Sequence, residues 1–200
     1  MKIATPSGPA LVDLDEPDAP AFLLVMTHGA NAGVATPDLL AARAAGRELG
    51  GAVARVLQPF RLAGRRAPGP EARQDEAWLT VVAALRERYG DLPLVQGGRS
   101  NGARVACRTA RKASARGVIA LAFPLHPSGR PERSRAGELY QAGVEVLVVN
   151  GDRDPFGVPD PAPGVQVCVL PGVGHDLGRD PAQVGRVVAG WLRRWTAVPG

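Results

Sequence analysis

Apolar residues are concentrated in six short runs of this 200-residue chain, and polar positions do not alternate within them. Runs of this kind are typical of strands in a parallel sheet that is covered on both faces. Parallel pairing requires long crossover connections, and the segments between the runs are long enough to hold helices. The predicted strands are residues 22–27, 52–58, 93–97, 117–122, 144–149 and 165–170. The predicted helices are residues 37–50, 71–89, 101–113, 134–142 and 181–195.

This pattern predicts an α/β fold with a mostly parallel sheet of about six to seven strands and helices on both faces. Residues 10–15 are a candidate for an additional strand at the edge of the sheet. Only about twenty residues separate the strand that ends near Ala122 from the next one, which leaves room for one short helix but not for a cap domain. We therefore expect one domain over residues 1–200, with a functional edge that is open to solvent.

Composition fits a soluble globular domain, because 45% of the residues are hydrophobic and 22% are charged. The segment Met1–Glu16 contains no apolar core of signal-peptide length, and no apolar run approaches the roughly 20 residues that cross a bilayer. We therefore expect a cytoplasmic protein. Cys107 and Cys168 are too far apart in the sequence for a zinc motif, and we expect small buried thiols.

The sequence Gly98-Arg99-Ser100-Asn101-Gly102 lies between a predicted strand and a predicted helix. In that position, Gly-x-Ser-x-Gly is the pattern of a nucleophile elbow, a turn so sharp that the serine hydroxyl projects above the sheet. A glycine is needed on each side because the neighbouring positions have no room for a bulky side chain. Ser100 is therefore the candidate nucleophile.

A serine nucleophile of this kind needs a carboxylate and a histidine, which follow it along the chain in that order. His175 follows the last predicted strand, and Asp152 and Asp154 both follow the strand before it. The frame Gly-x-x-Asp-Pro favours Asp154 as the acid, with Asp152 as the alternative or as a turn residue. The carboxyl ends of parallel strands share one edge of the sheet, so we expect Ser100, His175 and the acid to meet there. His175 would accept the serine proton, and the acid would orient the imidazole.

Two backbone N–H groups are expected to stabilise the negative charge that develops on the substrate oxygen. One belongs to Asn101, directly after the nucleophile, and the other to Ala30 in the loop after the first predicted strand. Each such donor is typically worth about 3–4 kcal/mol of transition-state stabilisation. His28 precedes the serine in the chain, and we expect it to brace this loop through its own hydrogen bonds.

Four segments resemble the small α/β-hydrolase-like proteins that include testis-expressed protein thirty and many uncharacterised bacterial homologues. These segments are residues 27–30, 98–106, 123–127 and 151–157. A basic, proline-containing stretch over residues 59–68 is similar to a loop of the same family. The resemblance covers nearly the whole chain and implies a minimal, lid-less α/β-hydrolase fold. It also implies that Ser100, Asp154 and His175 form the catalytic triad, and it places Asn101 where many members have Met.

The net charge of +5 invites a nucleic-acid partner, but the 24 basic residues are dispersed and aromatic residues make up only 4% of the chain. Few side chains are thus available for stacking bases, and we expect neither a nucleic acid nor a membrane as partner. Arg65 and Arg66 follow the carboxyl end of a strand, and Arg99 lies in the elbow itself. These three arginines are candidates for binding an anionic substrate. His126, in the loop after the elbow helix and its following strand, is a candidate for lining the same pocket.

No glycine-rich segment has the spacing of a P-loop or of a dinucleotide fingerprint, and the sequence has no cluster of metal ligands. We therefore expect neither a cofactor nor a metal. The predicted function is a serine hydrolase that cleaves an ester or similar acyl bond of a small molecule through an acyl-enzyme. The alternative is a non-catalytic scaffold of the same fold that acts through protein–protein contacts.

Overall fold

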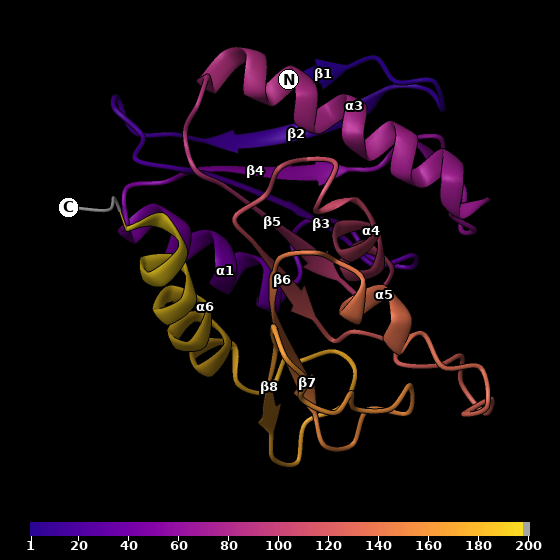
Figure 1. Ribbon diagram of the computed structural model, residues 1–200. Coiled ribbons are helices and arrows are strands. Elements are labelled where there is room, and N and C mark those ends of the chain that lie inside the picture. Colours follow the sequence, from indigo (N-terminus) through magenta and orange to yellow (C-terminus); the bar gives the residue numbers. More distant parts are fainter. Residues whose placement is uncertain (198–200) are drawn as a thin grey trace.

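A computed structural model describes residues 1–197 of the chain, which form a central sheet flanked by helices (Figure 1). The sheet has eight strands in the order β1-β2-β4-β3-β5-β6-β7-β8. The strands are β1 (Lys2–Ile3), β2 (Ala10–Asp15), β3 (Leu23–Thr27), β4 (Ala52–Leu57), β5 (Leu94–Arg99), β6 (Gly117–Leu121), β7 (Glu145–Gly151) and β8 (Val165–Leu170). The helices are α1 (Pro37–Glu48), α2 (Pro59–Leu62), α3 (Glu71–Tyr89), α4 (Asn101–Thr109), α5 (Ala136–Tyr140) and α6 (Pro181–Thr196).

The predicted α/β architecture is confirmed, and the sheet is slightly larger than the six to seven strands expected. The strands from β3 to β8 pair in parallel, whereas β1 and β2 add an antiparallel edge next to β4. The candidate strand over residues 10–15 is β2. The unpredicted strand, β1, has two residues and pairs with Ala10 and Leu11, so it is too short to carry a hydrophobic pattern. α2 is also unpredicted, because its four residues lie in a stretch expected to be a loop.

The two faces of the sheet carry separate hydrophobic clusters, because successive residues of a strand point to opposite sides. In β3, Leu23 and Val25 belong to one cluster, whereas Leu24 and Met26 belong to the other. Side chains of α3, α4 and α5 complete the first cluster, and those of α1 and α6 complete the second. The helices of each group lie on the same side of the sheet (Figure 1). Because helices cover both faces of the sheet, side chains on both sides of each strand are buried. This explains why the strands are uninterrupted apolar runs in the sequence. No helix within residues 1–197 is both long and apolar enough to cross a bilayer.

The junction between β5 and α4 lies directly against the end of β3. A Cβ atom added to Gly98 would lie 2.7 Å from the carbonyl oxygen of Thr27, and one added to Gly102 would lie 2.7 Å from the same oxygen. The Gly102 Cβ would also lie 2.8 Å from the carbonyl oxygen of His28. Backbone atoms cannot move aside as a flexible side chain can. The helix can therefore begin immediately behind the strand only when both positions are glycine.

Replacing helical glycines in two different surroundings tests this constraint. Gly102→Ala should destabilise the protein by about 1–3 kcal/mol or more, because the new methyl group overlaps backbone atoms. Gly190→Ala in α6 should instead stabilise it by about 0.5–1 kcal/mol, because no atom lies within 4 Å of the new Cβ and alanine favours a helix. Urea unfolding measures both changes. Equal effects of the two substitutions would show that close packing at the junction is not the constraint.

Candidate functional site

Ser100 occupies the sharp turn between β5 and α4, where its backbone has φ 53° and ψ −114°. A residue with a Cβ atom is strained in such a conformation, typically by about 1–3 kcal/mol. Two hydrogen bonds hold the turn: the Ser100 N–H donates to the Leu121 carbonyl of β6 (2.9 Å), and the Ser100 carbonyl accepts from the Arg104 N–H (3.2 Å). The backbone thus places the Ser100 side chain at the carboxyl edge of the sheet, where it lines a cleft.

His175, in the loop after β8, lies between Ser100 and Asp154. Its Nε2 atom is 2.9 Å from Ser100 Oγ, and its Nδ1 atom is 2.8 Å from Asp154 Oδ2. In the neutral ring, Nδ1–H would donate to the carboxylate, which leaves Nε2 free to accept from the serine hydroxyl. The ring of Phe156 packs against the imidazole with its centroid 4.4 Å away. The structure therefore brings together the three residues that the sequence nominated, in the order that proton transfer from Ser100 requires.

The two candidate acids have different surroundings. The side chain of Asp154 is fully buried, and its second oxygen, Oδ1, accepts a hydrogen bond from the Phe156 N–H (2.9 Å). Asp152 is exposed, and its Oδ1 accepts from the Gly172 N–H (2.7 Å) in the turn after β8. The geometry thus favours Asp154 as the partner of His175. The contact of Asp152 with the Gly172 N–H is typical of a turn residue, which is the role that the sequence offered for it as the alternative to the acid.

Ala30 and Asn101 both line the cleft beside Ser100. Within residues 1–197, no backbone carbonyl accepts a hydrogen bond from either of their N–H groups. Asn101 is the first residue of α4, where the N–H groups have no partner inside the helix. These two donors are therefore available to an oxygen atom placed next to Ser100.

His28 holds the loop that carries Ala30. Its Nε2 atom accepts a hydrogen bond from the Gln58 N–H (2.9 Å), and its Nδ1 atom lies 2.8 Å from the Gly29 carbonyl oxygen. Since one nitrogen accepts and the other faces a carbonyl, these contacts fit a neutral ring with hydrogen on Nδ1. Burial is the main reason that the pKa of His28 is lowered to about 4. The ring therefore ties the Ala30 loop to the end of β4 without carrying charge.

The cleft around Ser100 has a volume of about 570 Å³ and is open to solvent. Of the arginines expected to bind substrate, only Arg99 lines it. Arg65 lines a smaller neighbouring pocket of about 110 Å³, and Arg66 is exposed and lines neither space. His126 also lies outside the cleft lining: its Nδ1 faces the Pro127 carbonyl, and its ring packs against Gly157.

Arg99 connects three parts of the site. Its Nη2 donates a hydrogen bond to the carbonyl oxygen of His175 (3.0 Å), and its Nε lies 3.0 Å from Oδ2 of Asp38 at the start of α1. The second contact is an ion pair without good hydrogen-bond alignment. The Asp38 carboxylate is fully buried, and burial raises its pKa. Arg99 therefore anchors the His175 loop to the elbow and to α1.

Sequence reasoning missed Asn150, the buried polar residue near the end of β7. Its Oδ1 accepts from the Phe123 N–H (2.8 Å), and its Nδ2 donates to the carbonyls of Phe123 (3.0 Å) and Gly157 (3.2 Å). It thus joins the loop after β6 to the loop that carries Asp154 and Phe156. An amide directly after the apolar run of residues 146–149 was the signal that could have revealed it.

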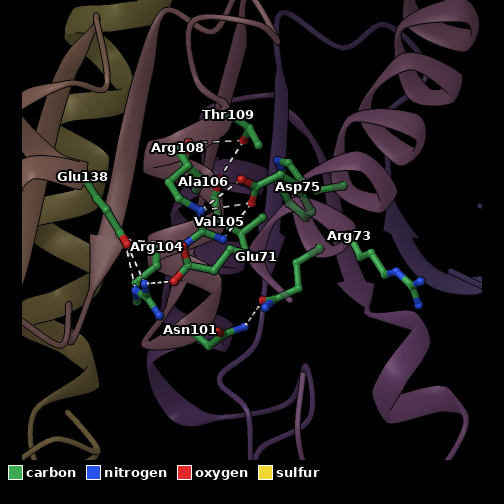
Figure 2. A network of polar contacts seen from close by, with 12 residues as sticks. Glu71, Arg73, Asp75, Asn101, Arg104, Val105, Ala106, Arg108, Thr109 and Glu138 are labelled. Atoms are coloured by element: carbon green, nitrogen blue, oxygen red, sulfur yellow. Dashed lines mark hydrogen bonds and ion pairs between the residues drawn. The ribbon is translucent and has the colours of Figure 1, made fainter. Parts of the chain in front are cut away.

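A network of charged side chains joins the three helices on the elbow side of the sheet (Figure 2). Arg104 of α4 pairs with Glu71 of α3 and with Glu138 of α5. Arg108, one turn later, forms a two-nitrogen contact with Asp75 of α3, at 2.7 Å from Nη2 and 3.0 Å from Nε. Both arginine side chains are only 13% exposed, whereas Glu71 is 54% exposed, so solvent screens the Arg104–Glu71 pair more than the pairs with Glu138 and Asp75. The network fixes α4, which begins at Asn101, relative to its neighbours.

The Asn101 side chain takes part in the same arrangement (Figure 2). Its Nδ2 donates to Oε1 of Gln74 on α3 (2.9 Å), and Gln74 in turn donates to the Gly69 carbonyl (2.7 Å). This chain of bonds holds the loop next to Pro68, which lines both the cleft and the smaller pocket. The polar side chain directly after Ser100 therefore has a structural partner on α3.

The comparisons with known proteins agree with this architecture. A family model described as alpha/beta hydrolase domain matches residues 20–180. No curated protein sequence matches the chain.

Solved structures with a similar fold come from several organisms. A lid-less α/β serine hydrolase from Xanthomonas campestris has 21% identity and a TM-score of 0.77, with 100% of this chain and 95% of that one covered. Est1E from Butyrivibrio proteoclasticus, solved with ferulic acid, has 16% identity and a TM-score of 0.78, with 99% of this chain and 100% of that one covered. A hyperthermophilic esterase from Pyrobaculum calidifontis has 16% identity and a TM-score of 0.68, with 98% of this chain and 83% of that one covered. At these identities the likeness establishes a common fold.

Because His28 is buried and neutral, we expect the protein to lose stability in mild acid. The unfolded histidine binds a proton below its ordinary pKa of 6.5, whereas the folded one stays neutral down to about 4. The unfolded state therefore binds more protons in this range, and the free energy of unfolding falls as the pH falls. His28→Gln, which keeps an acceptor for the Gln58 N–H, should reduce the loss between pH 7 and pH 5 by about 2 kcal/mol. Urea unfolding at both pH values measures it, and an identical loss in the variant would contradict the assignment.

Proposed function

The chain belongs to the alpha/beta hydrolase domain family, and we propose that it is a serine hydrolase that cleaves an ester or similar acyl bond. One observation carries the proposal: His175 lies 2.9 Å from Ser100 Oγ and 2.8 Å from the buried Asp154 carboxylate. The esterase from Pyrobaculum calidifontis and the lid-less serine hydrolase among the structural neighbours support it. An open cleft of about 570 Å³ suits a small-molecule substrate.

In the first half of the proposed reaction, Ser100 Oγ attacks the carbonyl carbon of the ester while its proton passes to Nε2 of His175. The oxygen of the resulting tetrahedral intermediate carries the negative charge. It accepts hydrogen bonds from the N–H groups of Ala30 and Asn101, which are preorganised and need no reorientation. The imidazolium is stabilised by the Asp154 carboxylate, whose position is fixed by the Phe156 N–H.

The intermediate then collapses, the bond between carbon and the leaving oxygen breaks, and His175 gives its proton to the departing alcohol. The product left on the protein is an acyl ester of Ser100. In the second half, a water molecule attacks this ester while His175 takes one of its protons. Collapse of the second intermediate releases the carboxylic acid and returns the proton to Ser100 Oγ.

We also infer that the chain belongs to the subgroup that includes testis-expressed protein thirty. The segments of residues 27–30, 98–106, 123–127 and 151–157 support this inference, because each begins within two residues of the carboxyl end of a strand, as site segments of this fold do. A cytoplasmic location is part of the same proposal, and cell fractionation would test it.

Labelling with a fluorophosphonate probe tests the proposed function. The wild-type protein should form one covalent adduct on Ser100, because attack on the phosphorus atom uses the same proton acceptor and oxyanion donors. Ser100→Ala should form none, and peptide mass spectrometry locates the adduct. A folded protein that neither reacts with the probe nor hydrolyses 4-nitrophenyl acetate would instead support the non-catalytic scaffold.

Substitution of the two candidate acids distinguishes their roles. Asp154→Asn should lower kcat by about 10⁴-fold, because the amide no longer fixes the imidazole tautomer. Asp152→Asn should change kcat little, because the new side chain keeps an oxygen that accepts from the Gly172 N–H. Steady-state kinetics with 4-nitrophenyl acetate measures both. Equal losses, or a larger loss in Asp152→Asn, would reverse the assignment.

A further inference from the structure

The cleft beside Ser100 has an unbalanced set of charged side chains. Three arginines line it, namely Arg99, Arg104 and Arg135, and none of the described residues that line it is an aspartate or a glutamate. A charged group of a substrate that enters the cleft therefore meets cations. Whether these cations attract an anion depends on how far each is already neutralised inside the protein.

Two of the three arginines are paired with carboxylates. Arg99 lies against the buried Asp38, and it donates to the carbonyl oxygen of His175. Arg104 pairs with both Glu71 and Glu138 (Figure 2). An anion that bound either guanidinium would have to compete with these built-in partners. Arg99 and Arg104 therefore serve the structure of the site.

Arg135 is different. Within residues 1–197 it forms no ion pair, and its side chain makes one hydrogen bond, from Nη1 to the Pro124 carbonyl at 3.4 Å. A guanidinium has five N–H donors, so most of those of Arg135 remain without a protein partner. Burial and the nearby charge of Arg104 lower the pKa of Arg135, which means that its charge is incompletely compensated.

The nearest carboxylates do not neutralise Arg135. Glu71 and Glu138 lie close enough to act on its charge through space, but both are bound by Arg104, and Glu138 also lies 3.5 Å from Arg108. The half-buried position of Arg135 strengthens its attraction for an anion relative to that of an exposed arginine. A planar guanidinium with free donors matches a carboxylate, which can accept two parallel hydrogen bonds.

We propose that Arg135 binds a carboxylate group of the substrate. The preferred substrates are then small esters that carry a free carboxylate in addition to the ester group. The inference rests on the proposed hydrolase function, because it assigns the specificity of the Ser100 cleft. The sequence instead predicted that Arg65 and Arg66 bind an anionic substrate, but these two arginines lie outside that cleft. Pro124 and Phe156, which line the cleft together with Arg135, leave apolar surface for the carbon chain between the two functional groups.

Kinetics with two matched substrates tests the proposal. 4-Nitrophenyl hydrogen succinate and 4-nitrophenyl methyl succinate release the same leaving group and differ in one negative charge. Wild-type kcat/KM should be about tenfold higher for the charged ester at low salt, as expected for a charge-assisted hydrogen bond. The ratio should fall toward one at 1 M salt, where the screening length shrinks to about 3 Å. Arg135→Gln should abolish the ratio, and Arg135→Lys should retain part of it.

Arg133→Gln is the matched control, because Arg133 is exposed, lies two residues away and is not part of the cleft lining. It removes the same charge and should keep the tenfold ratio. The proposal is overturned if the wild-type protein shows no preference, if Arg135→Gln leaves the ratio unchanged, or if Arg133→Gln removes it equally. Melting temperatures of all variants establish that they are folded.

Binding to Ser100→Ala separates this proposal from the hydrolase proposal, because it requires no chemistry. Monomethyl succinate should bind this variant about tenfold more tightly than dimethyl succinate, as calorimetry would measure, and addition of Arg135→Gln should remove the difference. Preference in binding without any ester hydrolysis by the wild-type protein would overturn the hydrolase function alone. Hydrolysis without preference in binding would overturn the role of Arg135 alone.

Discussion

The rest of the site depends on how closely the backbone at the start of α4 approaches the end of β3. Gly98 and Gly102 allow this approach, and the strained turn at Ser100 lies between them. Because the helix begins without an intervening loop, its first residue, Asn101, lines the same cleft as Ser100. The carbonyls of Thr27 and His28 lie against this junction, so the Ala30 loop is placed by the same contact. One packing constraint thus positions Ser100, the proposed nucleophile, and both candidate oxyanion donors.

A second constraint brings the histidine across the sheet. β8 is separated from β5 by β6 and β7, so the loop after β8 must pass over the end of β7 to reach Ser100. A Cβ atom on Gly151 would lie only 2.0 Å from the Val173 carbonyl oxygen, which shows how closely this loop crosses the strand. The same carbonyl accepts a hydrogen bond from the Arg153 N–H (2.9 Å). Arg99 then holds the far end of the loop through the His175 carbonyl. Glycine at position 151 is therefore as necessary to the site as the glycines of the elbow.

Most of the fold was predictable from the sequence because its main elements have a strong apolar pattern. The six parallel strands and five of the helices lie within a few residues of their predicted positions, whereas β1 and α2 were missed because they have two and four residues. Ser100, His175 and the two candidate acids were identifiable because each follows a strand at the carboxyl edge. The arginines were not assignable in the same way. Arg99 is paired with Asp38, 61 positions away in the sequence, and Arg104 with Glu138, 34 positions away. No local sequence pattern reveals partners at such distances.

The energetic features of the site favour a catalytic role over a scaffold role. Of the four non-glycine residues with positive φ among the described residues, Ser100, Ala122 and Leu177 lie in or near the site, and Ser114 follows α4. The Asp154 carboxylate is fully buried. Strain and buried charge each destabilise a fold by roughly 1–3 kcal/mol or more unless other contacts compensate. A binding scaffold requires none of them, because a partner surface can be built from ordinary exposed side chains. Their concentration around one hydroxyl, with two free N–H donors beside it, is what acyl transfer requires, and it is difficult to explain by folding or by partner binding alone.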